Sequence, residues 1–305
     1  MIKFYKNILI QTARSIFYQF KFLWLFWITN IVFAVVLTLP ISTLIGLHLG
    51  NSLINHRLAV EFDYQWFLQF RYDHRGAIAA IHPFVFSVAF VYMLIQLFYT
   101  GGLLTVILNR SKNHYVDFFY GGVKYFIRFL KVFFVMLLFY IVAFMVDVLT
   151  EFGLNLFIDS SYNEFIYASL TTLRYLLFLF LIVLINIMAD YSKVIIAVTD
   201  RYDALAVIRD AFIFIRKNAD KVFIVYLTIS SFVAIAAITY NVVDGFLPKR
   251  PMLLLIPVFI IQQILIIFRV LIKMFFFTSE VFLYQDLSSD VYEVVPEEIS
   301  TGVDK

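Results

Sequence analysis

Residues 132–146 have the sequence Val-Phe-Phe-Val-Met-Leu-Leu-Phe-Tyr-Ile-Val-Ala-Phe-Met-Val, and none of these side chains is charged. The apolar stretch continues past Asp147 to Thr150. A helix needs about 20 mainly apolar residues to cross the roughly 30 Å hydrocarbon core of a bilayer. Residues 132–150 are therefore predicted to form a membrane-spanning helix.

Five more stretches of this kind occur along the chain. The chain has 305 residues, of which 63% are hydrophobic and 15% charged, whereas a soluble domain averages about 45–50% apolar and about 25% charged residues. The composition excludes a water-soluble protein and predicts an all-α fold, a polytopic membrane helix bundle of about six transmembrane helices. The six stretches are centred near Val36, Phe90, Leu138, Phe180, Ala234 and Ile260, and the predicted spans cover 22–46, 78–108, 132–150, 170–190, 222–243 and 252–272.

Basic residues are distributed unequally between the two sides of this arrangement. Fifteen Lys and Arg residues lie in the N-terminal arm and in two predicted loops, 109–131 and 191–221, while the opposite loops hold five, with Arg174 at the boundary. Lys and Arg are enriched in cytoplasmic loops of membrane proteins. Both termini are therefore predicted to be cytoplasmic, which agrees with an even number of crossings.

Several segments are predicted to lie along the membrane surface. Residues 1–21 are predicted to form an amphipathic interfacial helix. A plain extension of the first span fits the sequence equally well, and the two interpretations are compatible with each other. A second surface helix is predicted over 203–217 and a short interfacial helix over 63–70, while the acidic segment 287–305 is predicted to be disordered. The polar face of the first segment consists of Lys3, Asn7, Gln11, Arg14, Tyr18 and Lys21.

The layout resembles the six-span membrane domain that is found fused to some bacterial glycerophosphodiester phosphodiesterases, and its stand-alone relatives. The residues that carry the resemblance are Gly101-Gly102 before the first basic loop, and Asp190-Tyr191 with Ala204-Leu205 at the second. No phosphodiesterase domain is attached here, so the resemblance implies an accessory role in a bacterial cytoplasmic (inner) membrane and no catalysis. The two basic loops also suggest two related hairpins, but any two basic loops between spans would look alike.

Polar residues inside the predicted spans are the candidates for a binding site. Charged groups at membrane depth are costly and usually functional. One hypothesis is a polar cavity that is formed by Asn186, Asp190, Gln262, Gln263, Arg269 and Lys273. In the alternative, the charged side chains of this group extend to the lipid head groups. The two glutamines, like Ser230 and Ser231, then form hydrogen bonds between helices. On the outer side, Asp147 and Arg174 are placed to form a structural ion pair.

Six basic residues are predicted to contact anionic lipid: Lys3, Lys6, Arg14, Arg209, Arg216 and Lys217. The absence of cysteine from the sequence excludes disulfides and thiolate ligands, and the spacing of His48, His56, His74 and His82 fits no helix-face metal site. No cofactor, metal or nucleic-acid partner is expected. The favoured function is a non-enzymatic scaffold or accessory subunit whose expected partners are membrane lipids, with another membrane protein as a candidate partner; the alternative is a transporter or lipid-handling protein.

Overall fold

The described part of the protein is almost entirely helical. The computed structural model describes residues 2–50, 58, 63–109, 114–157, 164–246 and 255–289. Within these ranges, six helices are long and apolar enough to cross a membrane, so the protein is the all-α polytopic membrane bundle that the sequence predicts. The helices are α1 (Ile2–Leu49), α3 (Tyr64–Asp73), α4 (Arg75–Leu108), α5 (Tyr115–Phe157), α6 (Glu164–Thr199), α7 (Ala204–Lys217), α8 (Ala219–Phe246) and α9 (Leu255–Ser289).

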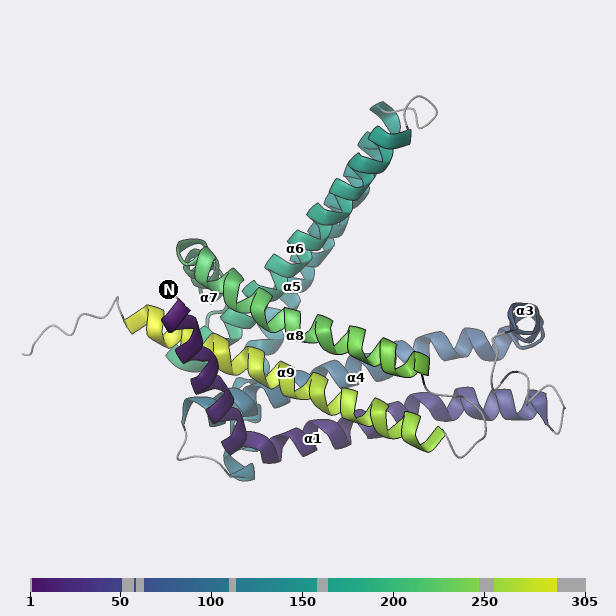
Figure 1. Ribbon diagram of the computed structural model, residues 1–305, viewed down its shortest axis with the longest axis horizontal. Helices are drawn as coiled ribbons and strands as arrows, with labels where there is room; N and C mark the ends of the chain where they lie inside the picture. Colours follow the sequence, from purple (N-terminus) through teal and green to yellow (C-terminus); the bar gives the residue numbers. More distant parts are fainter. Residues whose placement is uncertain are drawn as a thin grey trace, which may run out of the picture.

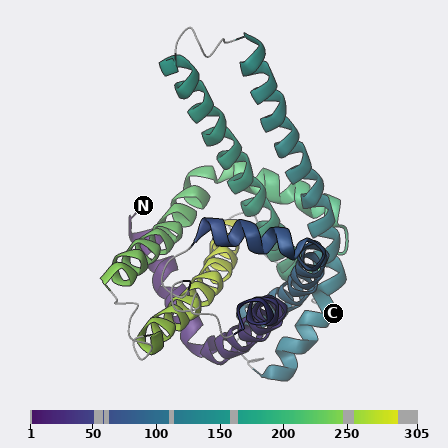
Figure 2. The same cartoon turned by 90° about the vertical axis from the view of Figure 1, so that its right-hand side faces the viewer.

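The six long helices divide into two groups that diverge from a shared base (Figure 1). Helices α1, α4, α8 and α9 extend to one side, whereas α5 and α6 form a hairpin that points away from them. The shared base carries the start of α1, the end of α9 and all of α7. Figure 2 looks onto the opposite end of the larger group, where α3 lies crosswise to the long helices.

The hydrophobic core lies in this base. Buried residues such as Phe22, Leu104, Phe129 and Ile195 come from four helices. Toward the far ends, large apolar side chains are exposed, for example Phe152 at 62% on α5. Apolar side chains exposed in this number are compatible with lipid and not with water, because a soluble protein rarely exposes a large continuous apolar surface.

The predicted loops are largely helical. The predicted loop 109–131 is wrong from Tyr115 onward, because α5 begins there, and the predicted loop 191–221 contains the end of α6, all of α7 and the start of α8. Hydropathy marks only the apolar part of a helix, so it misses turns that extend past the apolar part with polar residues. The two elbows differ in structure: residues 117–131 belong to α5 itself, whereas α7 connects α6 to α8.

Two other surface predictions are confirmed as helices. Asp63 caps the N-terminus of α3 by accepting hydrogen bonds from the backbone N–H groups of Gln65 and Trp66. Asp203 caps α7 in the same way through Leu205 and Ala206. Such a cap satisfies backbone donors that the first helical turn leaves without partners.

The N-terminal segment is continuous with the first span, since α1 runs unbroken from Ile2 to Leu49. Its first part nevertheless runs at an angle to the remainder (Figure 1). The inward face of this part is more polar than predicted, because Thr12, Ser15 and Gln19 are buried while Phe17 is exposed. The predicted boundary at residue 21 is therefore no break in the helix. The predicted acidic tail lies outside the described residues from 290 onward.

Helices α4 and α5 cross at two glycine pairs. Each pair leaves no room for a side chain: a Cβ atom on Gly102 would lie 2.4 Å from the backbone oxygen of Phe118, and one on Gly121 would lie 2.0 Å from Thr105 Oγ1. Small residues of this kind let two membrane helices approach closely. Gly101-Gly102 on α4 therefore packs against Gly121-Gly122 on α5.

The turn between α6 and α7 is fixed by two basic residues of α5. Lys124 Nζ lies 2.9 Å from Asp200 Oδ2, and Arg128 pairs with the other carboxylate oxygen and donates to the backbone oxygen of Asp200. These contacts, led by the hydrogen bond from Lys124, lower the pKa of Asp200 below its ordinary value of 3.8. Asp200 has a φ of 55°, a left-handed conformation that Asp tolerates better than most residues.

Candidate functional site

A cavity of about 620 Å³ lies between the hairpin α5–α6 and helices α4, α8 and α9. We call it the fork pocket. One part of its wall is apolar, with Met136 and Phe276 among its residues. The other part is polar and consists of Gln96, Thr100, Tyr140, Asn186, Asp190, Lys193, Tyr226, Arg269 and Lys273.

The sequence hypothesis of a polar cavity is met for four of its six residues. Asn186, Asp190, Arg269 and Lys273 all line the fork pocket. Gln262 does not; it is exposed on α9. Gln263 is used between helices instead, because its Oε1 atom accepts a hydrogen bond of 3.2 Å from Trp27 Nε1 on α1.

The alternative for the two serines, a hydrogen bond between helices, is not met for Ser231. Neither Ser230 nor Ser231 lines the fork pocket. The hydroxyl of Ser231 donates to the backbone oxygen of Thr228 in its own helix. The polar groups near the middle of α8 therefore do not extend the cavity.

Two polar groups of the fork pocket lie far from the ends of their helices. Lys273 is close to the middle of α9, which has 35 residues. Gln96 precedes the end of α4 at Leu108 by twelve residues, which corresponds to roughly 18 Å at about 1.5 Å per residue. Asp190 and Lys273 lie at the ends of the predicted spans 170–190 and 252–272, and the helices that contain them continue to Thr199 and Ser289.

Hydrogen bonds connect the polar groups across helices. Lys273 Nζ donates to Gln96 Oε1 at 2.6 Å, which connects α9 to α4. The Tyr140 hydroxyl donates to Asn186 Oδ1 at 2.7 Å, which connects α5 to α6. Lys193 Nζ lies 2.8 Å from Asp190 Oδ1 one turn away on α6. The carboxylate of Asp190 therefore pairs with Lys193 of its own helix.

Glu280 is a buried carboxyl group next to this cluster that sequence reasoning missed. Its side chain is on α9 and is only 4% exposed, and its Oε2 atom has no hydrogen-bond partner among the described residues. It interacts electrostatically with Asp190 and Lys193. Residue 280 lies beyond the predicted span 252–272, so no carboxyl group was predicted inside the bundle at this position.

The predicted ion pair on the hairpin is confirmed. Arg174 Nε lies 3.2 Å from Asp147 Oδ1, and Arg174 Nη1 lies 3.2 Å from Glu151 Oε2. The Arg174 side chain is 8% exposed. This three-residue cluster joins α5 to α6 away from the fork pocket and has a structural role.

The basic residues predicted to contact lipid lie on the surface. Lys6, Arg14, Arg209, Arg216 and Lys217 are all exposed; Lys3 belongs to α1, but its side chain is not among the described parts. All six belong to α1 or α7, which lie at the shared base (Figure 1).

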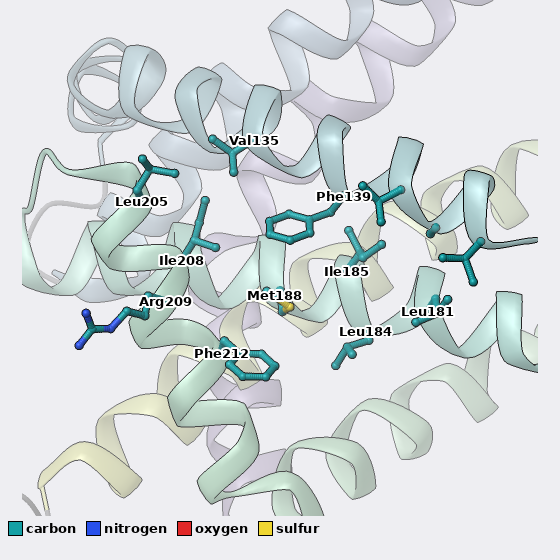
Figure 3. A pocket seen from close by; sticks show the side chains of 13 residues that line it. Val135, Phe139, Leu181, Leu184, Ile185, Met188, Leu205, Ile208, Arg209 and Phe212 are labelled. Atoms are coloured by element: carbon teal, nitrogen blue, oxygen red, sulfur yellow. The ribbon is translucent and has the colours of Figure 1, made fainter.

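A second cavity, of about 570 Å³, lies where α7 meets the hairpin. Figure 3 shows Leu205, Ile208 and Phe212 of α7 facing apolar side chains of α5 and α6. Arg209, the only charged residue in its lining, directs its guanidinium group away from it (Figure 3). This second cavity is apolar and offers no group that could select a ligand, so the fork pocket is the stronger candidate site.

The comparisons with known proteins add no function to this geometry. No protein-family model, curated protein or solved structure matches the chain. The resemblance to the membrane domain of glycerophosphodiester phosphodiesterases therefore stays a prediction.

Proposed function

We propose that the protein is a lipid-handling membrane protein that holds an amphiphilic molecule in the fork pocket. The observation that carries the proposal is a cavity with both polar and apolar walls at the middle of long apolar helices. A charged side chain near the centre of a membrane helix costs about 2.5–3.5 kcal/mol. The bundle places several such groups around one space, which favours a ligand that compensates the cost.

The position of the pocket suits a ligand that arrives from the membrane. The pocket is lined by both helices of the hairpin α5–α6 and by α4, α8 and α9, and the hairpin diverges from these other helices (Figure 1). An amphiphile could place its head against Asn186 and Lys273 and its chain along Met136 and Phe276. A soluble metabolite would gain less from the apolar wall, because buried apolar area contributes about 25 cal/mol per Å².

A variant that fills the pocket tests this proposal. Ala189 lines the fork pocket on α6, and Ala168 is exposed on the same helix. After removal of loosely bound lipid, native mass spectrometry should find lipid on the wild type and on Ala168→Trp, but not on Ala189→Trp. Equal retention by both variants, or no lipid on the wild type, would contradict the proposal.

A scaffold role is the second candidate, and the exposed basic residues of α1 and α7 favour it. Arg209, Arg216 and Lys217 present three positive charges on one short helix. Juxtamembrane basic residues contribute about 1 kcal/mol each near an anionic leaflet. This role is compatible with lipid handling, and it also agrees with the expectation that the protein is not an enzyme.

We also propose that both termini face the cytoplasm of a bacterial inner membrane. The start of α1 and all of α7 lie at the shared base together with the end of α9 (Figure 1). The contact of Lys124 and Arg128 with Asp200 brings the two predicted basic loops together. A base that gathers the basic segments is the side that the positive-inside rule assigns to the cytoplasm.

A further inference from the structure

We propose that the ligand of the fork pocket is an anionic membrane lipid whose phosphate group binds between Arg269, Lys273 and Gln96. This inference rests on the proposed function and adds the chemical class of the head group. It depends on the hydrogen-bond donors in the pocket that lack an acceptor and on the balance of charge around them.

Three donors in the fork pocket have no anionic partner among the described residues. Arg269 makes no hydrogen bond or ion pair with the other described residues, although it lines the pocket. Lys273 donates to the neutral oxygen of Gln96 but forms no ion pair within the described part of the chain. The Nε2 atom of Gln96 is buried and has no acceptor. A buried donor left without an acceptor costs about 1–3 kcal/mol.

The charge of the pocket is positive even after every nearby carboxylate is counted. Lys193, Arg269 and Lys273 are its three cations, and Lys273 interacts electrostatically with the other two. Asp190 is already paired with Lys193 at 2.8 Å. If the buried Glu280 is also counted as charged, three cations face two carboxylates, which leaves a net charge of +1.

An anion compensates this arrangement better than water does. Water molecules could accept hydrogen bonds from the three donors, but they would leave the positive charge uncompensated in a medium of low dielectric constant. A phosphate group offers several acceptor oxygens, and Arg and Lys form strong charge-assisted hydrogen bonds to it. Gln96 belongs to α4 and the two cations belong to α9, so one phosphate would join two helices.

The apolar wall identifies the source of the phosphate. Phe133 and Met136 of α5 and Phe276 of α9 lie in the same cavity as the donors. A free phosphate ion would leave these side chains without a partner, whereas the acyl chains of a lipid would cover them. The geometry therefore favours a phosphate that belongs to a lipid.

Binding of two lipids with identical acyl chains tests the inference. The probes are dioleoyl phosphatidic acid, dioleoyl phosphatidylcholine and inorganic phosphate, each titrated onto the delipidated full-length protein and followed by native mass spectrometry. The wild type should bind phosphatidic acid about tenfold or more tightly than phosphatidylcholine, because the net negative charge of phosphatidic acid offsets the positive charge of the pocket, whereas the phosphate of phosphatidylcholine is already balanced by its own quaternary ammonium group.

The cations of the pocket should account for this preference. The double variant Arg269→Gln/Lys273→Gln should lose the preference for phosphatidic acid. The single variant Arg269→Gln should lose part of this preference, although it changes an exposed side chain and leaves the Lys273–Gln96 hydrogen bond intact. The control Lys131→Gln removes an exposed cation of α5 that lies outside the pocket and should keep the preference.

The outcomes separate this inference from the proposed function. If both lipids bind equally well and Ala189→Trp abolishes both, lipid handling stands and the anionic head group is wrong. If inorganic phosphate binds as tightly as phosphatidic acid, a lipid source is wrong. If neither lipid binds the wild type, the proposed function itself is wrong.

Discussion

At the scale of single residues, the crossing of α4 and α5 depends on glycines that nothing larger can replace. The variant Gly121→Ala should destabilise the protein by about 1–3 kcal/mol, the usual cost of overpacking, because its Cβ would lie 2.0 Å from Thr105 Oγ1. Thermal unfolding in detergent measures the effect.

Gly153 on the same helix provides the control for this prediction. A Cβ on Gly153 would meet nothing within 4 Å, and Ala is favoured over Gly within a helix by about 1 kcal/mol. The variant Gly153→Ala should therefore be neutral or stabilising. Equal destabilisation by both variants would contradict the role of the α5 glycines in the close crossing of α4 and α5.

Asp200 makes the stability of the α6–α7 turn depend on pH. Its pKa is lowered in the folded protein, so the charged form stabilises the fold at and above the ordinary pKa of 3.8, and this stabilisation is lost as the pH falls through the lowered value. The effect is small, because the Asp200 side chain is 52% exposed and is screened by solvent.

The variant Asp200→Asn isolates this dependence. It should lower the melting temperature at pH 6, where the wild type has the charged carboxylate, and this difference should shrink as the pH is reduced below 3.8. Melting temperatures of both proteins between pH 6 and pH 3 provide the measurement. A difference that stays constant over that range would contradict the assigned role of Asp200.

Some of these residue roles were predictable and others were not. A carboxylate and an arginine at facing ends of two adjacent spans predict the Asp147–Arg174 pair, because a hairpin brings those ends together. The pairing of Arg128 with Asp200 is not visible in the sequence, since a loop and a distant helix form it. The role of Gln96 in the fork pocket was not predictable, because a single glutamine in an apolar stretch does not indicate which residues of other helices lie beside it.

At the scale of helices, α7 is the element whose charges should matter most for the surrounding lipid. The variant Arg209→Gln/Arg216→Gln/Lys217→Gln should lower the ratio of anionic to zwitterionic lipid that remains around the protein. At about 1 kcal/mol per basic residue, the enrichment should fall severalfold. Lipid analysis of protein extracted in native nanodiscs gives this ratio.

Two arginines at the other end of the molecule serve as the comparison. Arg71 and Arg75 are exposed at the junction of α3 and α4, away from the shared base. Their replacement by Gln should change the ratio less than the α7 variant does. An unchanged ratio in the α7 variant would remove lipid contact as a role for this helix.

Helix existence was predictable in this chain and helix length was not. An apolar stretch of about 20 residues implies a span, and the alternation of polar and apolar residues over 203–217 implies α7. The first turns of α5 contain Lys124, Arg128 and Lys131, which lower the local hydropathy below that of a span. Such a segment is helical because it packs against α4 and the α6–α7 turn, and those contacts are tertiary.

At the scale of the whole molecule, the divergence of the hairpin α5–α6 creates the fork pocket. Six spans do not predict this divergence, because hydropathy counts crossings without giving the angle between them. Four of the residues that surround the pocket could be named from the sequence, since charged and amide groups inside apolar stretches are rare. Which of them converge depends on the angle at which the hairpin leaves the base.

The central structural claim is that both groups of helices cross the same membrane, and single cysteines test it most directly. The chain contains no cysteine, so each variant carries one reactive site. Gln69→Cys on α3 and Leu156→Cys at the far end of the hairpin occupy one side in this arrangement, and Asn7→Cys and Gln285→Cys occupy the other; all four positions are exposed. A membrane-impermeant maleimide should label the first pair in intact cells and the second pair only after permeabilisation. Labelling of Gln69→Cys and Leu156→Cys from opposite sides would contradict the claim, because the hairpin would then not cross the membrane with the other helices.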